Sequence, residues 1–374
     1  MWAILIKEFR QLRRDRRTVA MLLMLPFLFL VIFGYAASFD VKNVKTVIVG
    51  PAAQSVVSLL PAQMDVVGTY PDADESFARD ALRDGEAVVA IVTPSEPGAG
   101  RGEVQILVDG TELFAARATV TAFAQLQTRG AANAPLQLPQ PEILFNPDLK
   151  TSVIMVPGLC GIILIFIGTM ATALGVVRER QAGTLEQLAV MPFKPRDVFI
   201  GKIGPYLLIA AVDMVVIVVV GMLLFGVPFR GSLLTFALGA GLFLFVTLGI
   251  GVLVSTVSQT QGQAIQLAMM TMLPQFLLSG LFFPLSSMPW GVRWIGYCLP
   301  LTWFVKVARG VMVRGTPIAA LWLPLTVLAL MAAIVFTLSV LRFRRDLAPA
   351  AAAVDDAGDE DDPGELGTTA GVLT

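Results

Sequence analysis

Charged and polar side chains suited to contact a partner gather in residues 178–188, between two apolar runs that are each long enough to cross a bilayer. Thr184 and Gln187 match the capping box that begins a helix. Gly183 separates this helix from the preceding one, and Pro192 ends it. The pattern predicts a short helix within residues 178–192 that transmits displacement from a partner into the membrane. The alternative is a polar loop held by ion pairs to lipid headgroups.

The residue types that are missing exclude several kinds of chemistry. The chain has no histidine, which excludes Ser-His-Asp catalysis, histidine metal sites and histidine proton relays. A phosphate-binding Walker loop is also missing, because the Gly201-Lys202 pair is followed by Ile203 and lacks the earlier glycine. We therefore expect no catalytic residues, metal or cofactor in this chain. Cys160 and Cys298 are expected to pack in apolar helices, with a disulfide between them as the alternative.

The composition is typical of a chain largely dissolved in lipid. Mean hydropathy is +0.75 and only 15% of the residues are charged, which lies outside the range of soluble globular proteins. A spanning helix needs roughly 20 mostly apolar residues. The runs that qualify are residues 18–39, 153–177, 201–225, 233–257, 264–283 and 318–341. The first is longer than the apolar part of a signal peptide, so we expect a retained helix.

Lysines and arginines near the span ends predict the orientation, because positively charged loops stay in the cytoplasm. They collect in residues 7–17, 178–202 and 342–345. The expected fold is an α-helical integral membrane protein with six transmembrane helices, cytoplasmic N and C termini, and an α/β extracytoplasmic domain between helices 1 and 2. One basic group falls on the outer side, in a segment at 284–317 that we expect to re-enter the outer leaflet and snorkel its charges. Its members are Arg293, Lys306, Arg309 and Arg314.

Residues 40–150 are predicted to form the extracytoplasmic domain. Valine- and isoleucine-rich runs that end at glycine or proline predict the strands, which are residues 45–49, 65–69, 86–93 and 103–108. An amphipathic helix is predicted at 74–83, with Phe77, Ala81 and Leu82 inward, and a longer helix at 112–129. We expect a folded cap that shields or gates an exit path. A specific ligand site is the alternative, although the segment has no metal-binding or catalytic cluster.

The two ends of the chain differ in character. Apolar residues at helical spacing among lysines and arginines predict an amphipathic interfacial (elbow) helix at 1–17, lying on anionic lipid. Residues 346–374 are alanine-rich and then acidic, without apolar periodicity. This composition predicts a disordered acidic tail, with a docking peptide as the alternative.

Polar residues inside apolar spans mark candidate substrate contacts, because each is costly in lipid and tends to face a cavity or another helix. Asp213 lies roughly 17 Å into the third span, with no cation in its own span. A structural pair with another helix, a role in transport and snorkelling to the lipid surface are the explanations left open.

A row of glutamines marks the start of the fifth span. Gln259, Gln263 and Gln266 recur at spacings of four and three, and a methionine group that includes Met270 follows them. Hydrogen bonding between helices explains such glutamines, and packing explains the methionines. The alternative is a pore lining that adapts to varied apolar substrates.

Several stretches in fixed order resemble the permease subunits of type-2 ABC exporters, in the multidrug-type branch with a large extracytoplasmic domain after the first helix. They are Val104-Gln-Ile-Leu-Val-Asp-Gly110, Asn146-Pro-Asp-Leu-Lys150, Pro157-Gly-Leu159, the segment at 178–188, Met191-Pro192, Gly201-Lys-Ile-Gly-Pro-Tyr206, Phe283-Pro284, Met288-Pro289 and Pro300-Leu-Thr302. The resemblance covers nearly the whole chain except the acidic tail, and it is specific in order and spacing. Gln181 departs from the pattern, since many relatives carry a charged residue there.

The resemblance implies that residues 178–188 contain a coupling helix, which sits in a groove of a separate ATP-binding subunit that binds ATP and Mg. The residues implied in this contact are Arg178, Glu179, Arg180, Gly183, Thr184, Glu186, Gln187 and Leu188. A second permease subunit, as a homodimer or close heterodimer, and a bacterial cytoplasmic (inner) membrane are implied as well. A periplasmic adaptor protein is left open, and no nucleic acid is expected. The implied function is export of a hydrophobic or amphipathic compound, driven by ATP hydrolysis in the partner.

Two other functions stay open on the residues alone. An ion-coupled secondary transporter could use Asp213, although no inverted repeat or pair of broken helices is visible. A membrane-anchored sensor could bind a ligand in its outer domain and signal through its cytoplasmic segment. The substrate itself cannot be read, because broad apolar surfaces carry little specific pattern.

Overall fold

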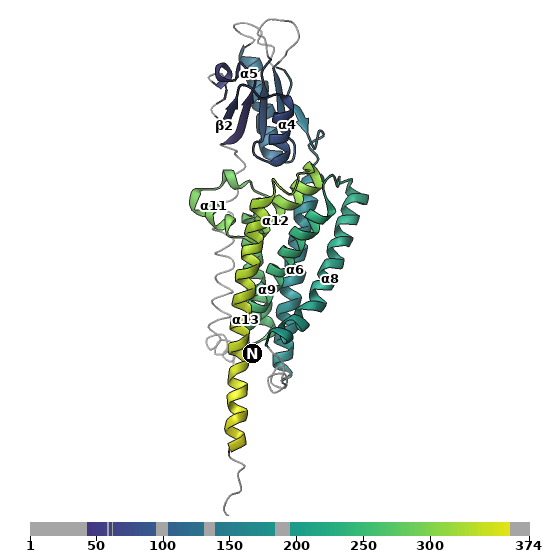
Figure 1. The fold of residues 1–374 in the computed structure, drawn as a ribbon, viewed down its shortest axis with the longest axis vertical. Helices are drawn as coiled ribbons and strands as arrows, with labels where there is room; N and C mark the ends of the chain where they lie inside the picture. The colour runs from purple at the N-terminus through teal and green to yellow at the C-terminus, as the bar shows by residue number, and fades with distance from the viewer. Residues whose placement is uncertain are drawn as a thin grey trace, which may run out of the picture.

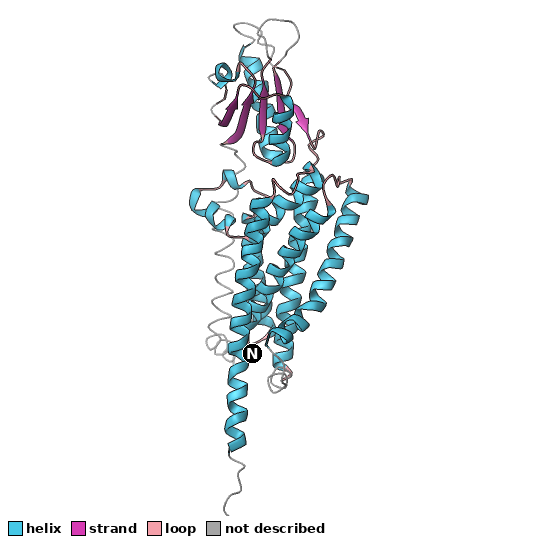
Figure 2. Cartoon of the chain, in the orientation of Figure 1, coloured by secondary structure: helices cyan, strands magenta, loops and turns pink. Residues whose placement is uncertain are grey.

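The computed structural model describes residues 43–57, 60–61, 63–94, 104–130, 139–183 and 195–359, with side chains described except at 127–130, 195–203, 205 and 343–359. Within these ranges an α/β body stands at one end of a long helical bundle (Figure 1). All the strands lie in the α/β body, and the bundle is helical (Figure 2). The elbow helix expected at 1–17 and the span expected at 18–39 lie outside the described residues.

The α/β body is built on a five-stranded sheet in the order β2-β1-β3-β4-β5. The strands are β1 (Val44–Val49), β2 (Met64–Tyr70), β3 (Val89–Val92), β4 (Gln105–Asp109) and β5 (Glu142–Leu144). β1 pairs in parallel with β2 and β3, β3 pairs antiparallel with β4, and β4 pairs in parallel with β5. The helices of this body are α3 (Ala53–Val57), α4 (Glu75–Asp84) and α5 (Leu113–Gly130). The sequence predicts the first four strands and the two longer helices, and it misses β5, which is only three residues long.

Alternation along the strands supplies two apolar cores, one on each face of the sheet. Ile48 of β1 packs with α5, whereas its neighbours Val47 and Val49 pack with α4. The same alternation continues in β3 and β4, because successive side chains of a strand point to opposite faces. The predicted inward residues of α4 are confirmed for Ala81 and Leu82, which are buried. The result is a three-layer body that buries its own core.

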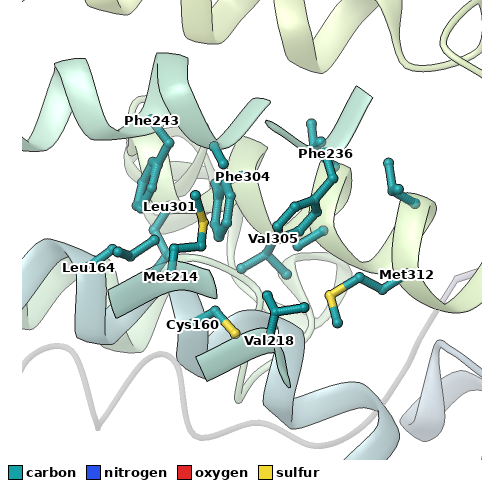
Figure 3. Packing of buried hydrophobic residues seen from close by; sticks show 14 of the residues in the cluster. Cys160, Leu164, Met214, Val218, Phe236, Phe243, Leu301, Phe304, Val305 and Met312 are labelled. Carbon is teal, nitrogen blue, oxygen red and sulfur yellow. The ribbon is translucent and has the colours of Figure 1, made fainter. Parts of the chain in front are cut away.

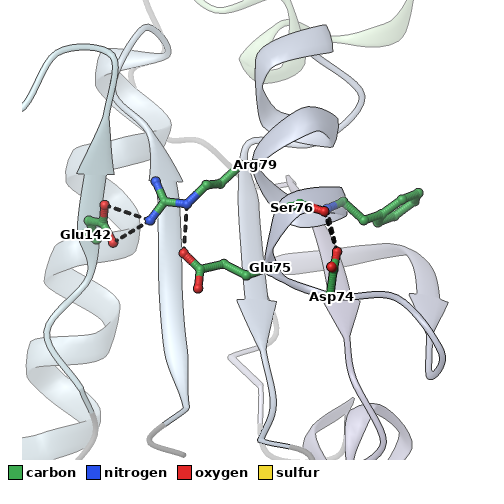
Figure 4. Close-up of polar contacts among 6 residues, drawn as sticks. Asp74, Glu75, Ser76, Arg79 and Glu142 are labelled. Carbon is green, nitrogen blue, oxygen red and sulfur yellow. Dashed lines mark hydrogen bonds and ion pairs between the residues drawn. The ribbon is translucent and has the colours of Figure 1, made fainter.

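Polar contacts fix the start of α4 and its position on the sheet. Asp74 accepts hydrogen bonds from the Ser76 hydroxyl at 2.6 Å and from the backbone N–H three residues on at 3.1 Å, as N-cap aspartates do. Arg79 forms ion pairs with Glu75 at 2.8 Å and with Glu142 of β5 at 3.1 Å (Figure 4). α4 is thereby tied to the edge strand that follows α5 in the chain.

The helical bundle contains four of the predicted spans among the described residues. Its helices are α6 (Thr151–Gln181), α8 (Pro195–Phe225), α9 (Leu233–Val257), α10 (Gln261–Leu278), η1 (Leu285–Ser287), α11 (Trp290–Tyr297), α12 (Pro300–Arg309), η2 (Gly310–Arg314) and α13 (Trp322–Asp359). The segments long and apolar enough to cross a membrane are Thr151–Gln181, Tyr206–Phe225, Leu233–Val257 and Trp322–Arg342. The chain is therefore a multi-pass membrane protein.

One expectation is not confirmed in the bundle and another is corrected. The fifth span, expected at 264–283, is not among these four apolar helices; α10 is only 18 residues long, contains Pro274 and begins with several glutamines. The tail expected to be disordered from residue 346 is helical as far as Asp359, because α13 continues through it. Ala348 and alanines 350–353 favour this continuation, since alanine has the highest helix propensity, whereas Pro349 within the stretch opposes it. Residues 360–374 lie outside the described residues.

The bundle core gathers side chains from α6, α8, α9, α12 and η2. Phe304 of α12 stacks on Phe243 of α9 with ring centroids 4.4 Å apart, and Cys160 and Met214 lie close by (Figure 3). Cys160 is buried and Cys298 is exposed, and both are free thiols, so the disulfide alternative is wrong.

Small residues let α6 and α9 approach closely. A Cβ atom at Gly251 of α9 would lie only 2.8 Å from the backbone oxygen of Thr169 of α6. The Thr169 hydroxyl donates to the carbonyl oxygen of Thr247 at 3.2 Å across the same interface. Close backbone approach with polar bonds between helices is the usual way in which helices associate in a membrane. α6 and α9 therefore form a tight pair that can carry the charged end of α6.

Candidate coupling site and transport pathway

The charged segment begins as a continuation of α6 rather than as a separate loop. Arg178, Glu179 and Arg180 lie on the last turn of this helix, which ends at Gln181. They stand at the end of the bundle opposite the α/β body (Figure 1). Arg178 is exposed, whereas Glu179 and Arg180 are half-buried. Cations are favourable at this position because the C-terminal end of a helix carries a partial negative charge.

Arg180 binds the end of a neighbouring helix. Its Nη1 atom donates to the carbonyl oxygens of Ser255 and Ser258, both at 3.0 Å. Ser258 is the C-cap that follows α9, so Arg180 satisfies carbonyl groups at the end of this helix that have no partner within it. The hydroxyls of these serines turn back and donate to carbonyl oxygens one turn earlier. The charged end of α6 is thereby joined to the α9–α10 corner.

Gln181 and Gly183 complete this corner. Gln261 Nε2 donates to Gln181 Oε1 at 3.0 Å, which ties α6 to the first turn of α10. A neutral amide partner explains why an uncharged residue fits at position 181. Gly183 follows the end of α6 with φ of 72°, a left-handed conformation that favours glycine. Thr184, Glu186, Gln187 and Leu188 lie outside the described residues.

The glutamine row differs from its predicted form. α10 begins at Gln261 with Thr260 as its N-cap, so Gln259 precedes the helix and is exposed. Its backbone N–H donates to Gln263 Oε1 at 3.0 Å, so this pair closes the α9–α10 corner. Gln266 Oε1 is buried without a hydrogen-bond partner among the described residues. Of the predicted row, Gln263 is structural and Gln266 keeps free hydrogen-bonding capacity.

Asp213 and Met270 lie on different helices. Asp213 is half-buried on α8 and forms no hydrogen bond or ion pair with any residue whose side chain the structure describes. Met270 is half-buried on α10. α6 packs against both helices. A carboxylate at mid-span without a described partner keeps the transport role open.

The basic residues of segment 284–317 do not snorkel into lipid as expected, because protein groups hold each of them. Arg293 donates to the carbonyl oxygens of Ser286 and Met288 at 2.8 and 3.1 Å. Lys306 lies 4.4 Å from the ring centre of Trp303 and 5.4 Å from that of Tyr297, a cation–π arrangement. The remaining two are Arg309 and Arg314, described next.

Arg309 and Arg314 bind backbone and carboxylate groups. Arg309, 7% exposed, donates to the carbonyl oxygens of Ile154 at 3.3 Å and Leu281 at 3.2 Å. Arg314 forms an ion pair with Asp109 of β4 at 3.2 Å. Burial raises the pKa of the Asp109 carboxyl, and the charge of Arg314 opposes this shift. The four cations thus fasten the short helices to the bundle and to the α/β body.

Several polar residues at these sites were not predicted from the sequence. Gln261, two residues before Gln263, is the first residue of α10. A further glutamine so close by indicates a polar turn between α9 and α10 rather than one polar face of a helix. Gln275 is 3% exposed on α10, and its Oε1 has no described partner. Asp109, which pairs with Arg314, ends a strand and precedes a glycine, a pattern that reads as an ordinary turn. Pairs separated by two hundred residues leave no local trace in a single sequence.

Comparison with known proteins agrees with this architecture. The chain is 29% identical over 334 residues to "Probable multidrug ABC transporter permease YbhS" of Escherichia coli (strain K12), covering 84% of this chain and 88% of that protein. It is 29% identical over 377 residues to "Inner membrane transport permease YhhJ" of the same organism, covering 91% and 96%. It is 24% identical over 361 residues to "Probable multidrug ABC transporter permease YbhR", covering 92% and 98%.

The family model described as "ABC-2 family transporter protein" matches residues 16–341, from the basic N-terminal region to the end of the last apolar segment. The match spans the α/β body and the whole bundle, and it includes the charged end of α6. The resemblance predicted from the sequence is confirmed, and the chain belongs to the ABC-2 family of transporter proteins as a permease.

Proposed function

We propose that the chain is the membrane-spanning subunit of an ABC exporter that moves a hydrophobic or amphipathic compound out of the cytoplasm or the inner leaflet. ATP hydrolysis in a separate subunit, which binds ATP and Mg, drives the transport, and this chain performs no catalysis. Two permease subunits form the pathway in a bacterial cytoplasmic membrane. The names of the relatives, two of which read "multidrug ABC transporter permease", support export of varied compounds.

The observation that carries the proposal is the junction of Arg180 with the α9–α10 corner. A partner that grips residues 178–188 would move the end of α6, and the hydrogen bonds from Arg180 and Gln181 would pass that movement to α10. α10 carries Gln266 and Met270, the candidate contacts of the substrate. A continuous set of contacts thus joins the proposed partner site to the candidate substrate contacts, which supports coupling between them.

The separation of the two ends supports the membrane topology. The charged end of α6 and the α/β body lie at opposite ends of the bundle (Figure 1). With basic loops retained in the cytoplasm, the α/β body faces the outside and both termini face the cytoplasm. Six spans result when residues 18–39 and α10 are added to the four apolar helices.

Copurification with a candidate ATP-binding protein, sought in the reading frames next to this one, tests the proposal. ATP hydrolysis that responds to substrate only when both proteins are present is expected. Gly183→Pro and Glu186→Lys should abolish transport-linked hydrolysis while membrane insertion stays intact. Normal coupled activity in both variants would reject the role of residues 178–188.

Ion-coupled transport is a second candidate because Asp213 has no described partner. An acidic side chain in a span can carry a proton or a cation. Reconstituted chain without any ATP-binding protein separates the two candidates. Uptake driven by a proton gradient in such vesicles would replace the first proposal, and transport that needs ATP and the second protein would reject the second.

A further inference from the structure

The α/β body is joined to the bundle by a buried ion pair. Arg314, the last residue of η2, donates to Asp109, the last residue of β4, over 3.2 Å. The Asp109 side chain is fully buried, and that of Arg314 is 11% exposed. Water and salt therefore screen this pair far less than a surface pair. The other carboxylate oxygen of Asp109 accepts the Thr111 N–H at 2.8 Å, which fixes the orientation of the carboxylate.

The C-terminal end of α4 also lies against the guanidinium group of Arg314. The Thr316 hydroxyl donates to the carbonyl oxygen of Arg83, near the C-terminus of α4, at 2.6 Å. A Cβ atom at Gly85, the residue after α4, would lie 2.9 Å from Arg314 Nη1. The cation therefore sits against the C-terminal end of a helix, where positive charge is favourable. η2 thus contacts two separate elements of the α/β body.

A second tie lies in the connection from β5 to α6. Asn146, 3% exposed, donates to the carbonyl oxygen of Gly110 at 3.3 Å and accepts the Lys150 N–H at 3.0 Å. Gly110 follows the paired aspartate, so both ties meet at one turn. Phe145 and Leu149 have φ of 67° and 47°, a left-handed conformation that persists in non-glycine residues only where the surroundings enforce it. The connection is therefore held in shape and is not a free hinge.

A third tie fastens the helix that leads into η2. Arg309 binds the carbonyl oxygens of Ile154, in the first turn of α6, and of Leu281, beyond α10. Arg309 is the last residue of α12, which runs directly into η2. The start of α6, η2 and the turn after β4 thus form one network of buried polar contacts.

We propose that the α/β body, η2 and the first turn of α6 move as one rigid body, so that a tilt of α6 swings the α/β body. α6 spans 31 residues, about 45 Å at 1.5 Å per residue, and a small tilt at its charged end displaces the other end. The rigid junction stands on the contacts above, whereas the tilt at the charged end rests on the proposed function.

Distance measurements on the full-length protein in lipid nanodiscs test the junction. Cys298, an exposed thiol on the bundle side, and Asp65→Cys on β2 carry spin labels, in a chain where the buried Cys160 is replaced by alanine. A narrow distance distribution is expected in this parent and a clearly broader one in Arg314→Ala. A distribution that is already broad in the parent would overturn the proposal.

Two further variants keep this result decisive. Thr316→Val removes a single hydroxyl donor and should broaden the distance distribution less than Arg314→Ala. If Arg314→Ala fails to fold, Thr316→Val takes its place in the test. Arg79→Ala removes an exposed ion pair within the α/β body and should leave the distribution narrow. Distributions as narrow in Arg314→Ala and Thr316→Val as in the parent would reject the rigid junction.

The swing is tested in the complex with the ATP-binding protein, trapped with ATP and vanadate. The distance between labels at Asp65→Cys in the two permease subunits is expected to change on trapping, and Arg314→Ala should abolish the change. An unchanged distance in a complex whose hydrolysis depends on this chain would reject the swing alone. Hydrolysis that does not depend on this chain would instead reject the proposed function.

Discussion

Arg180 on the last turn of α6 donates a hydrogen bond of 3.0 Å to the carbonyl oxygen of Ser258, the C-cap of α9. The bond links the segment expected to meet the ATP-binding partner with the helix that packs most closely on α6. It assigns different tasks to two neighbouring arginines. Arg178 is exposed and available to a partner, whereas Arg180 holds the bundle together.

Replacing the two arginines by alanine should therefore give different defects. Arg180→Ala loses hydrogen bonds from a charged group and should destabilise the bundle by about 2 kcal/mol, seen as a lower midpoint of thermal unfolding in detergent. Arg178→Ala should leave that midpoint unchanged and reduce copurification of the ATP-binding protein. Equal midpoints for the two variants would contradict this division.

Gly183 can be tested through its backbone conformation alone. A Cβ atom there would meet nothing within 4 Å among the described residues, so within that part of the chain its φ of 72° is what restricts the residue type. Gly183→Ala should cost about 1–2 kcal/mol in this conformation, and Gly183→Asn should cost less because asparagine tolerates it. ATP-driven transport in vesicles should follow the order Gly, Asn, Ala. Equal transport in the two variants would contradict the left-handed turn.

Asp213→Asn separates a charge role from a packing role. The substitution keeps size and polarity and removes the negative charge. If the carboxylate contacts cationic cargo, efflux of cations should fall about tenfold or more while efflux of neutral compounds persists, since a lost charge contact costs roughly 1.5–3 kcal/mol. Efflux of both classes is measured at equal expression. Unchanged efflux of cations would remove Asp213 from the pathway.

The close approach of α6 and α9 predicts opposite effects for two glycines of the same helix. Gly251→Ala places a methyl group 2.8 Å from a backbone oxygen of α6 and should cost about 1–3 kcal/mol. Gly241 has nothing within 4 Å among the described residues, so Gly241→Ala should be neutral or slightly stabilising through helix propensity. Thermal unfolding of both purified variants decides, and a larger loss for Gly241→Ala would be inconsistent with the interface.

Low pH should loosen the start of α4. Hydrogen bonds from the Ser76 hydroxyl and the backbone N–H of Phe77 hold the pKa of Asp74 below its usual range. The ionised cap therefore stabilises the helix above the unfolded-state pKa near 4, and this contribution is lost as pH falls through the folded-state pKa. Hydrogen exchange of the first turn of α4 should accelerate in that window. Asp74→Asn should remove the pH dependence, and an unchanged profile would exclude the cap as its source.

Local patterns in the sequence predict the elements well where side-chain periodicity is strong. The alternation around Ile48 and the long apolar runs of α6, α8, α9 and α13 are each visible in a short window of residues. The boundary of α10 was predicted less well, because Gln259 was expected in a helical row, whereas Thr260 caps the helix and leaves Gln259 outside it. The extension of α13 was missed because acidic composition outweighed alanine propensity.

In the candidate coupling site, too, local features were predicted and contacts between distant residues were not. Arg178–Arg180 and Gly183 were identified from local composition, whereas the acceptors of Arg180 lie about 75 residues away and have no special sequence signal. The pair of Asp109 and Arg314 is separated by 205 residues. For Arg309 and Arg314 the expected snorkelling was wrong for this reason, because their partners lie 28 to 205 residues away in the sequence. The partners of Arg293 and Lys306 lie within nine residues, but they are carbonyl oxygens and aromatic rings that carry no opposite charge.

The partners of that basic group also bear on biogenesis. Each of its four cations is bound by groups that precede it in the chain, including the carbonyl oxygens of Ile154 and Leu281 for Arg309. A newly made chain thus presents every acceptor before the corresponding charge leaves the ribosome. No cation in this segment has to wait for α13 to be synthesised, so the membrane insertase need not shelter an uncompensated charge at the bilayer edge.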